Sequence, residues 1–173
     1  RVHVQPDTLG ALKDQRYQGP PLWAFFPPEQ RWEPIPTQEP WPLNKFGASL
    51  EYIPELGGSL WQYAGSTWRF DYDKKSWHRY ADSQTALPIE TLVAYDPGRK
   101  LLIAHRGPHK ESPPRTWHMS LAGGRPGDWE QVLEADNLPN GHDARSLMYF
   151  DPVGKVALLY ERAEKRIWSY DPG

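Results

Sequence analysis

With 173 residues, of which 38% are hydrophobic and 13% aromatic, the chain is long enough to form one domain with a sizeable core. The formal net charge of −2 and the scattered basic residues argue against a nucleic-acid-binding protein, which normally carries a basic face. The sequence has no run of about 18 apolar residues, which argues against a transmembrane helix, and it has no cysteine, which excludes disulfides and thiolate chemistry.

We assign no structure to residues 1–21. The chain begins with Arg1 rather than methionine, and no basic-then-apolar signal peptide stands at this end. Because a processed or truncated end would have lost such a signal, the compartment stays open, with an extracytoplasmic location favoured over a cytoplasmic one.

From about residue 22 onward the sequence repeats. Four tryptophans each open a short aromatic segment and recur about every 50 residues, a period typical of propeller blades or solenoid units. These tryptophans are Trp23, Trp68, Trp117 and Trp168. Their segments alternate bulky apolar with small or polar residues and are interrupted by turn-forming residues, which indicates half-buried strands joined in hairpins.

Each of these segments predicts the second hairpin of a repeat unit. Residues 23–32 and 68–77 have an aromatic residue two positions after the first tryptophan, and a second tryptophan seven positions after that aromatic. Residues 117–129 repeat the hairpin with a longer glycine-rich turn, and residues 168–173 begin it. We therefore expect two sets of equivalent positions: third-strand positions at Phe25, Phe70, Met119 and Tyr170, and fourth-strand positions at Trp32, Trp77 and Trp129.

Another hairpin precedes each of the later units. Residues 50–54, 93–97 and 148–152 predict a strand that ends in a proline turn, and residues 59–63, 101–104 and 156–160 predict the strand that follows it. Two hairpins per period make a four-stranded antiparallel unit, which cannot bury both of its faces alone and needs neighbours. In a β-propeller the neighbours are adjacent blades, with large aromatic side chains between the sheets.

This pattern resembles that of the kelch-type β-propellers, the superfamily of galactose oxidase. The resemblance is carried by Phe70, Asp71 and the Trp77 that follows, and by Gly65 and Gly107, which stand where a kelch blade has a glycine doublet. It implies an all-β propeller of four-stranded antiparallel blades over residues 22–173. The blades are partial at residues 22–34, complete at 47–80 and 91–133, and partial again at 146–173.

The resemblance implies about three to four blades and thirteen strands, whereas closing a propeller takes at least about four blades of four strands. A piece of a longer propeller explains the shortfall, and a complete open sheet protein is the alternative. We expect Trp168 and Tyr170 to lie on a strand without an outer neighbour in the chain. A continuation, another chain that supplies further blades, or pairing of residues 2–4 with residues 167–171 would cover that strand.

No cofactor is expected. The copper centre of galactose oxidase depends on a tyrosine cross-linked to a cysteine, which this chain cannot supply. His105 and His109 have the spacing of two metal ligands on one helical face, but Gly107-Pro108 between them breaks a helix, so that only a loop site stays open and we predict no metal. Arg106 belongs to a basic stretch, residues 99–115, for which anion or polysaccharide binding is the alternative to a solvated loop.

Acid–base chemistry has one local candidate, the neighbours His142 and Asp143, with Arg145 nearby. Adjacent residues of an extended chain point to opposite sides, so that a turn before a strand is the favoured interpretation and no catalytic residue is assigned.

In a propeller, the connections between blades and those between the second and third strands emerge on one face, and binding residues concentrate on such loops. Here they comprise residues 36–46, 81–90, 106–114, 134–145 and 161–165. On or directly beside these loops, the candidate partner-binding residues are Trp41, Lys45, Glu90, His105, Arg106, His109, His142, Asp143 and Arg145. Trp41 is a plausible contact for a partner or a sugar ring, with packing over a blade edge as the alternative.

We expect a noncatalytic binding or scaffold module that recognises a protein partner or a glycan through this loop-rich face. The alternative is a hydrolase or lyase with its site in the central funnel of the propeller, where His142, Glu90 and Lys45 would point together beside a carboxylate of perturbed pKa.

Overall fold

The computed structural model describes residues 2–4, 22–38, 40, 42, 49–63, 66–80, 87–122, 128–140 and 146–173. In this part of the chain the fold is all-β: fourteen strands form four antiparallel sheets, and η1 (Pro54–Leu56) is a single 3-10 turn. Over the same residues, no helix has the length and apolar character needed to cross a membrane.

The first two sheets contain strands β1 to β7. The first sheet has the order β1-β2-β3, with β1 (Val2–Val4), β2 (Leu22–Phe26) and β3 (Arg31–Ile35). The second sheet has the order β4-β5-β6-β7, with β4 (Ser49–Ile53), β5 (Gly58–Tyr63), β6 (Ser66–Asp71) and β7 (Ser76–Tyr80).

The last two sheets repeat this plan. The third sheet contains β8 (Leu92–Asp96), β9 (Leu101–Arg106), β10 (Arg115–Ser120) and β11 (Glu130–Glu134), which follow one another in that order. The fourth sheet has the order β12-β13-β14, with β12 (Leu147–Asp151), β13 (Val156–Glu161) and β14 (Arg166–Tyr170).

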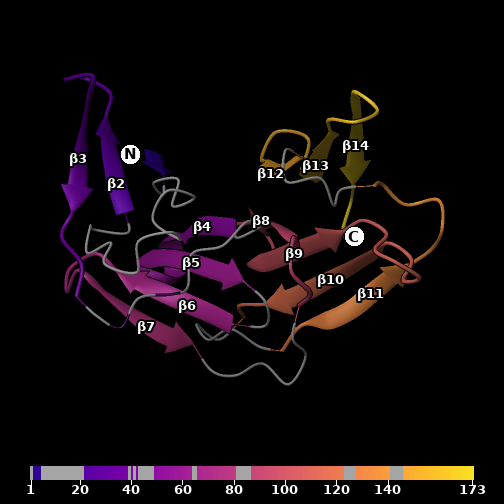
Figure 1. Cartoon of the computed structure of the whole chain (residues 1–173), viewed down its shortest axis with the longest axis horizontal. Coiled ribbons are helices and arrows are strands. Elements are labelled where there is room, and N and C mark those ends of the chain that lie inside the picture. Colours follow the sequence, from indigo (N-terminus) through magenta and orange to yellow (C-terminus); the bar gives the residue numbers. More distant parts are fainter. Residues whose placement is uncertain are drawn as a thin grey trace.

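The four sheets follow one another like blades along an arc. Strand β8 lies against both β4 and β12, so that the first strands of the second, third and fourth sheets meet at the inner side. The first and fourth sheets stand at the two ends of the arc, and the described strands do not close a ring (Figure 1).

The strand register confirms the predicted equivalence of the aromatic positions except at Trp129, which falls one residue before the fourth strand β11 (Glu130–Glu134). Phe25 lies opposite Trp32 and Phe70 lies opposite Trp77, and in both pairs the ring centroids are 5.0 Å apart. The third-strand residues also share a position relative to the strand before them, because each lies opposite the second residue of that strand. The pairs are Phe70 with Ser59, Met119 with Leu102, and Tyr170 with Ala157. Trp129 immediately precedes β11, whose Glu130 lies opposite His118, so that Trp129 comes next in register, beside Met119.

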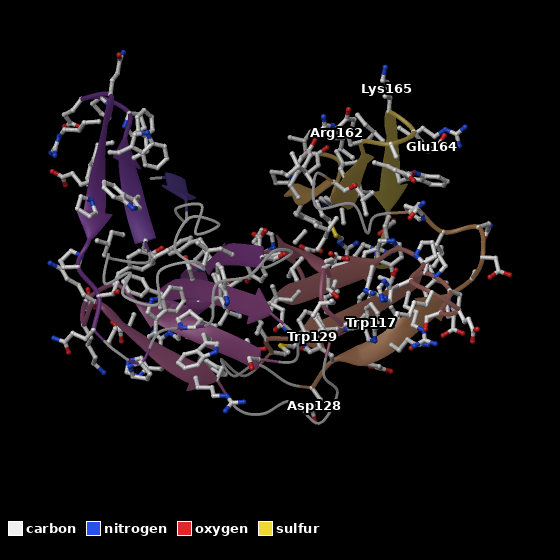
Figure 2. All side chains as sticks on the ribbon, viewed as in Figure 1. Trp117, Asp128, Trp129, Arg162, Glu164 and Lys165 are labelled. Atoms are coloured by element: carbon white, nitrogen blue, oxygen red, sulfur yellow. The ribbon has the colours of Figure 1, made fainter. Side chains whose placement is uncertain are left out.

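Aromatic side chains fill the spaces between successive sheets. Between the first and second sheets, Leu22 packs in one buried cluster with Trp61, Phe70 and Trp77. Between the second and third sheets, a larger cluster joins Ile53, Leu56 and Leu60 of one sheet to the side chains Val93, Leu102, Ala104, Trp117, Met119 and Trp129 of the other. Figure 2 shows Trp117 and Trp129 on the third sheet, where both are buried. We call each space that holds a buried fourth-strand tryptophan an indole slot.

Two polar contacts between sheets lie at the turns that join the first and second strands of a sheet. The hydroxyl of Tyr95 on β8 donates to Glu55 Oε2 in the second sheet, at 2.5 Å. Arg99, in the turn between β8 and β9, binds Asp96 of its own sheet at 2.7 Å and Asp171 beyond β14 at 3.3 Å.

The turns at this end share one design. Asp71, Asp96, Asp151 and Asp171 each use one carboxylate oxygen to accept a backbone N–H from two residues further on. Lys75, Lys100 and Lys155 end three of the four-residue turns with a positive φ, of 51°, 52° and 56°. Each turn therefore satisfies its own polar groups.

The N-terminal strand was not foreseen. Residues 2–4 were one candidate partner for residues 167–171, but Val2–Val4 pairs with β2 instead, with Val2 opposite Phe25 and Val4 opposite Trp23. Within the described residues β14 pairs with β13 alone, as expected for the strand of Trp168 and Tyr170.

The indole slots make a prediction about stability. Trp77 is 2% exposed and Trp32 is 47% exposed, although both occupy the same register position of a hairpin. Trp77→Ala should lower the free energy of unfolding by about 3–5 kcal/mol because it empties a slot, and Trp32→Ala should cost clearly less. Urea unfolding of both variants measures the difference, and equal losses would contradict the assignment.

Candidate functional site

Five of the candidate residues, namely Trp41, Lys45, His142, Asp143 and Arg145, lie outside the described residues. The other four fall around the third sheet, and the structure separates them into different environments.

Arg106 and Glu90 lie near each other on the side of the second sheet. Arg106 is 6% exposed, and its Nε donates to the backbone oxygen of Ile89 at 2.9 Å. Burial lowers the pKa of Arg106, and the nearby Glu90 carboxylate opposes that shift. The guanidinium thus anchors the connection that leads from β7 into β8.

His105 points the other way, toward the fourth sheet. Its Nε2 lies 3.0 Å from the backbone oxygen of Pro139, and its Nδ1 lies 3.0 Å from the Thr116 hydroxyl. A carbonyl oxygen only accepts, so that Nε2 carries the proton and Nδ1 can accept from the hydroxyl. Burial lowers the pKa of His105, while the Pro139 carbonyl and the charge of Glu161 act against it. A neutral imidazole with both nitrogens bound is a structural bridge between β9, β10 and the loop before β12.

A polar pair at the same place in the second sheet supports this assignment. Gln62 lies opposite Thr67 there, as His105 lies opposite Thr116, and the Thr67 hydroxyl donates to Gln62 Oε1 at 2.5 Å. All four residues are buried. The chain therefore uses a hydrogen-bonded pair at this position twice, with glutamine in one sheet and histidine in the other.

His109 lies apart from His105 in the connection between β9 and β10. Its backbone N–H and oxygen exchange hydrogen bonds with Ser112, at 3.0 and 2.9 Å, and form an isolated bridge. Over the described part of the chain, no three histidine, aspartate or glutamate side chains gather as a metal site would require.

A concave site lies between the third and fourth sheets. It is a cavity of about 240 Å³, contributed by both sheets and by the loop that joins them. Its lining comprises His105, Thr116, Leu133, Asn137, Leu138, Pro139, Met148, Ala157, Leu159, Trp168, Ser169 and Tyr170.

The aromatic walls of the cavity are held by hydrogen bonds at their polar ends. Trp168 Nε1 donates to Glu161 Oε2 at 2.8 Å, and Glu161 is buried. The Tyr170 hydroxyl lies 3.0 Å from His118 Nε2 across the boundary between the two sheets. Burial raises the pKa of Tyr170 and lowers that of His118, so that both groups are neutral near pH 7. The rings are thereby fixed, and they present their apolar faces to the cavity.

Sequence reasoning named His105 but missed this cavity. Its walls come from six strands and one loop, and their approach depends on how two sheets pack. The available signal was the expected lack of an outer neighbour for the strand of Trp168 and Tyr170.

One carboxyl group stands out at the inner side of the arc. Glu51, on the innermost strand β4, is partly buried, and desolvation raises its pKa from 4.5 to about 7. It lies opposite Leu60, which belongs to the cluster between the second and third sheets.

No protein-family model and no curated protein matches this sequence.

His105 gives a pH-dependent prediction. Its pKa is lower in the folded chain than the ordinary 6.5, so below pH 6.5 the unfolded chain takes up a proton that the folded chain resists. The free energy of unfolding should fall as the pH drops from 7.5 to about 5, and His105→Gln should make that fall less steep. His118 shifts in the same direction and remains in the variant.

Because Gln62 already fills this role beside Thr67, His105→Gln should cost about 1 kcal/mol or less at pH 7.5. His105→Ala leaves Thr116 and the Pro139 oxygen without this partner and should cost about 1–3 kcal/mol. Unfolding curves at several pH values test both points, and unchanged pH dependence in His105→Gln would contradict the assignment.

Proposed function

We propose that this chain is a noncatalytic binding module, a kelch-like propeller segment that recognises a protein partner through its loop-rich face. The observation that carries the proposal is the cavity between the third and fourth sheets. It reaches that face through Asn137, Leu138 and Pro139 of the interblade connection.

The size and lining of the cavity favour a protein side chain as its occupant. Pockets for whole small-molecule ligands are typically about 300–1,000 Å³, so that about 240 Å³ suits a single anchoring group. Apolar walls formed by Leu133, Met148 and Leu159 are those of a pocket that takes up an anchor residue in a protein interface.

A glycan fits this lining less well. Sugar hydroxyls need several free polar partners, whereas His105 already binds Thr116 and Pro139, and the polar ends of Trp168 and Tyr170 are occupied by Glu161 and His118.

Selection from a displayed peptide library, run beside a glycan array, tests the proposal. We expect peptides rich in aromatic or large apolar residues to be enriched and the glycan array to stay blank. Ala157→Phe fills the cavity and should abolish peptide binding, whereas Ile167→Ser should retain it. Ile167 is on the same sheet but is 70% exposed and is absent from the cavity lining, which makes it a matched control. Glycan binding, or peptide binding that survives Ala157→Phe, would contradict the proposal.

A hydrolase or lyase acting in the central funnel is the second candidate, and Glu51 is the observation that favours it. A carboxyl group with a pKa of about 7 on the innermost strand has the proton affinity of a general acid or base at neutral pH. Hydrolytic activity on polysaccharide or ester substrates that Glu51→Gln removes would favour this candidate over the binding module.

Glu51 also predicts a stability effect that is independent of activity. Its pKa is raised in the folded chain, so its protonated form is favoured there, and the folded state is penalised as the pH rises from 4.5 through about 7. Glu51→Gln should therefore be more stable than the parent at pH 8, by on the order of 1–3 kcal/mol, and similar to it at pH 4. Thermal unfolding at both pH values measures the difference, and a variant less stable at pH 8 would contradict the raised pKa.

A further inference from the structure

We infer that Gln62 and Arg106 form a site for one carboxylate group, which an acidic side chain of the protein partner supplies. The two residues lie between the second and third sheets, near the ends of β5 and β9, where the connections to β6 and β10 begin. This inference rests on the proposed function and adds an acidic residue to the apolar anchor of the partner.

Both side chains face the space between the second and third sheets. Side chains two positions apart on a strand point to the same face of its sheet. Gln62 follows Leu60 by two positions on β5, and Arg106 follows Ala104 by two positions on β9. Leu60 and Ala104 both belong to the buried cluster between these two sheets. Gln62 and Arg106 therefore point into the same space, beyond the same side of that cluster.

A hydrogen bond between the sheets joins the immediate neighbours of these two residues. Ser49 lies opposite Gln62, and its hydroxyl donates to the backbone oxygen of Thr91 at 3.2 Å. Thr91 immediately precedes β8, and the register of β8 with β9 places it beside Arg106. The row that contains Gln62 thus meets the row that contains Arg106.

Both residues have donor nitrogens without an acceptor. Arg106 uses Nε for the backbone oxygen of Ile89, and Gln62 uses Oε1 for the Thr67 hydroxyl. Within the described residues, the two terminal nitrogens of Arg106 and the amide nitrogen of Gln62 have no hydrogen-bond partner, although the residues are only 6% and 5% exposed. None of these nitrogens is among the fully buried atoms without a partner, so that each keeps some surface that a ligand can reach. Donors held in so buried a place, above all charged ones, require an acceptor.

The corresponding positions of the next space are satisfied from within the chain. His105 stands in the third sheet where Gln62 stands in the second, and Glu161 stands in the fourth sheet where Arg106 stands in the third. The histidine donates to a backbone oxygen of the loop before β12 at 3.0 Å, and Glu161 accepts from Trp168 at 2.8 Å. The space between the second and third sheets therefore differs, because its donors still need an acceptor.

The charges around Arg106 favour an acceptor with a single negative charge. Glu90 favours the charged form of Arg106, and Arg115 opposes it. Arg115 is paired with Glu134 at 2.6 Å. The two arginines and two glutamates of this group cancel in formal charge, so that a dianion would be repelled by both glutamates. The planar guanidinium instead matches the two oxygens of one carboxylate, which Asp and Glu side chains provide.

A small carboxylate probe tests the site directly. N-acetylglutamate methylamide is titrated into the isotopically labelled protein at pH 7 and followed by NMR, with N-acetylglutamine methylamide as the matched neutral probe. We expect the glutamate probe to shift the Arg106 Nε–H and Gln62 side-chain amide signals saturably, and the glutamine probe to leave them in place. Inorganic phosphate should bind more weakly than the glutamate probe.

Three protein variants complete the design. Gln62→Glu keeps an acceptor for the Thr67 hydroxyl and would supply Arg106 with a carboxylate from the chain itself. It should lose binding of the glutamate probe, and its melting temperature at pH 7 should equal or exceed that of the parent. Arg106→Lys loses the planar fork and should bind at least about tenfold more weakly; if it does not fold, Gln62→Glu decides alone. Arg162→Gln, which removes an exposed charge from a turn of the fourth sheet, should bind like the parent (Figure 2).

The library peptides that test the proposed function show whether a protein partner supplies the carboxylate. The selected peptides should carry an acidic residue in addition to their apolar anchor. Replacing that residue with its amide should weaken binding to the parent at least about tenfold and should have little effect on binding to Gln62→Glu.

Shifts that are absent, or equal for the two probes, would overturn the carboxylate site. Unchanged probe binding in Gln62→Glu, or phosphate that binds more tightly than the glutamate probe, would also overturn it. Peptides that depend on the cavity at Ala157 but on no acidic residue would overturn the inference and leave the proposed function standing. Binding of the probe without binding of any library peptide would reject both the proposed function and the partner as the source of the carboxylate.

Discussion

The first three sheets are held together by two buried tryptophan side chains, each of which enters the space beside the preceding sheet. A lone four-stranded sheet with apolar residues on both faces cannot bury them. Here Trp77 and Trp129 each pack in a cluster shared by two neighbouring sheets, so that each sheet buries apolar side chains of the other. The register of each hairpin follows, because a shift by one residue would turn these side chains to the other face. The contact of β8 with β4 lies beside the second of these clusters.

Polar contacts add specificity to this apolar packing. The pairs of Gln62 with Thr67 and of His105 with Thr116 are buried and hydrogen bonded on the face directed to the next sheet. In the fourth sheet the same opposed positions are Tyr160 and Ile167, which are 36% and 70% exposed. The pair is therefore used where another sheet packs against it. Buried polar groups that satisfy each other favour one alignment over near alternatives.

The architecture could be read from the sequence because its signals are local and repeated. The hairpins of Phe25 with Trp32 and of Phe70 with Trp77 are encoded within ten residues each. The pairing of β1 with β2 could not be found in this way, because a strand of three residues is too short to show an alternation of apolar and polar residues.

The site was less predictable for a related reason. The role of His105 depends on Pro139, which lies 34 positions away along the chain, and the pKa of Glu51 depends on burial created by packing between sheets. The H-x3-H spacing with His109 was compatible with a loop metal site, but the two histidines make separate structural contacts.

The two ends of the molecule differ in how their connections are held, and the aspartate turns show the difference. Asp71, Asp96 and Asp151 close their turns with bonds inside a few residues, so that this end is set by the strands it joins. The opposite end carries the longer connections, whose described part meets the strands at contacts such as that of His105 with Pro139. Sequence changes, insertions and grafted recognition loops should therefore be tolerated at one end and rejected at the other. A scaffold with this asymmetry can acquire new partners through changes in its longer connections while the packing of its strands stays the same.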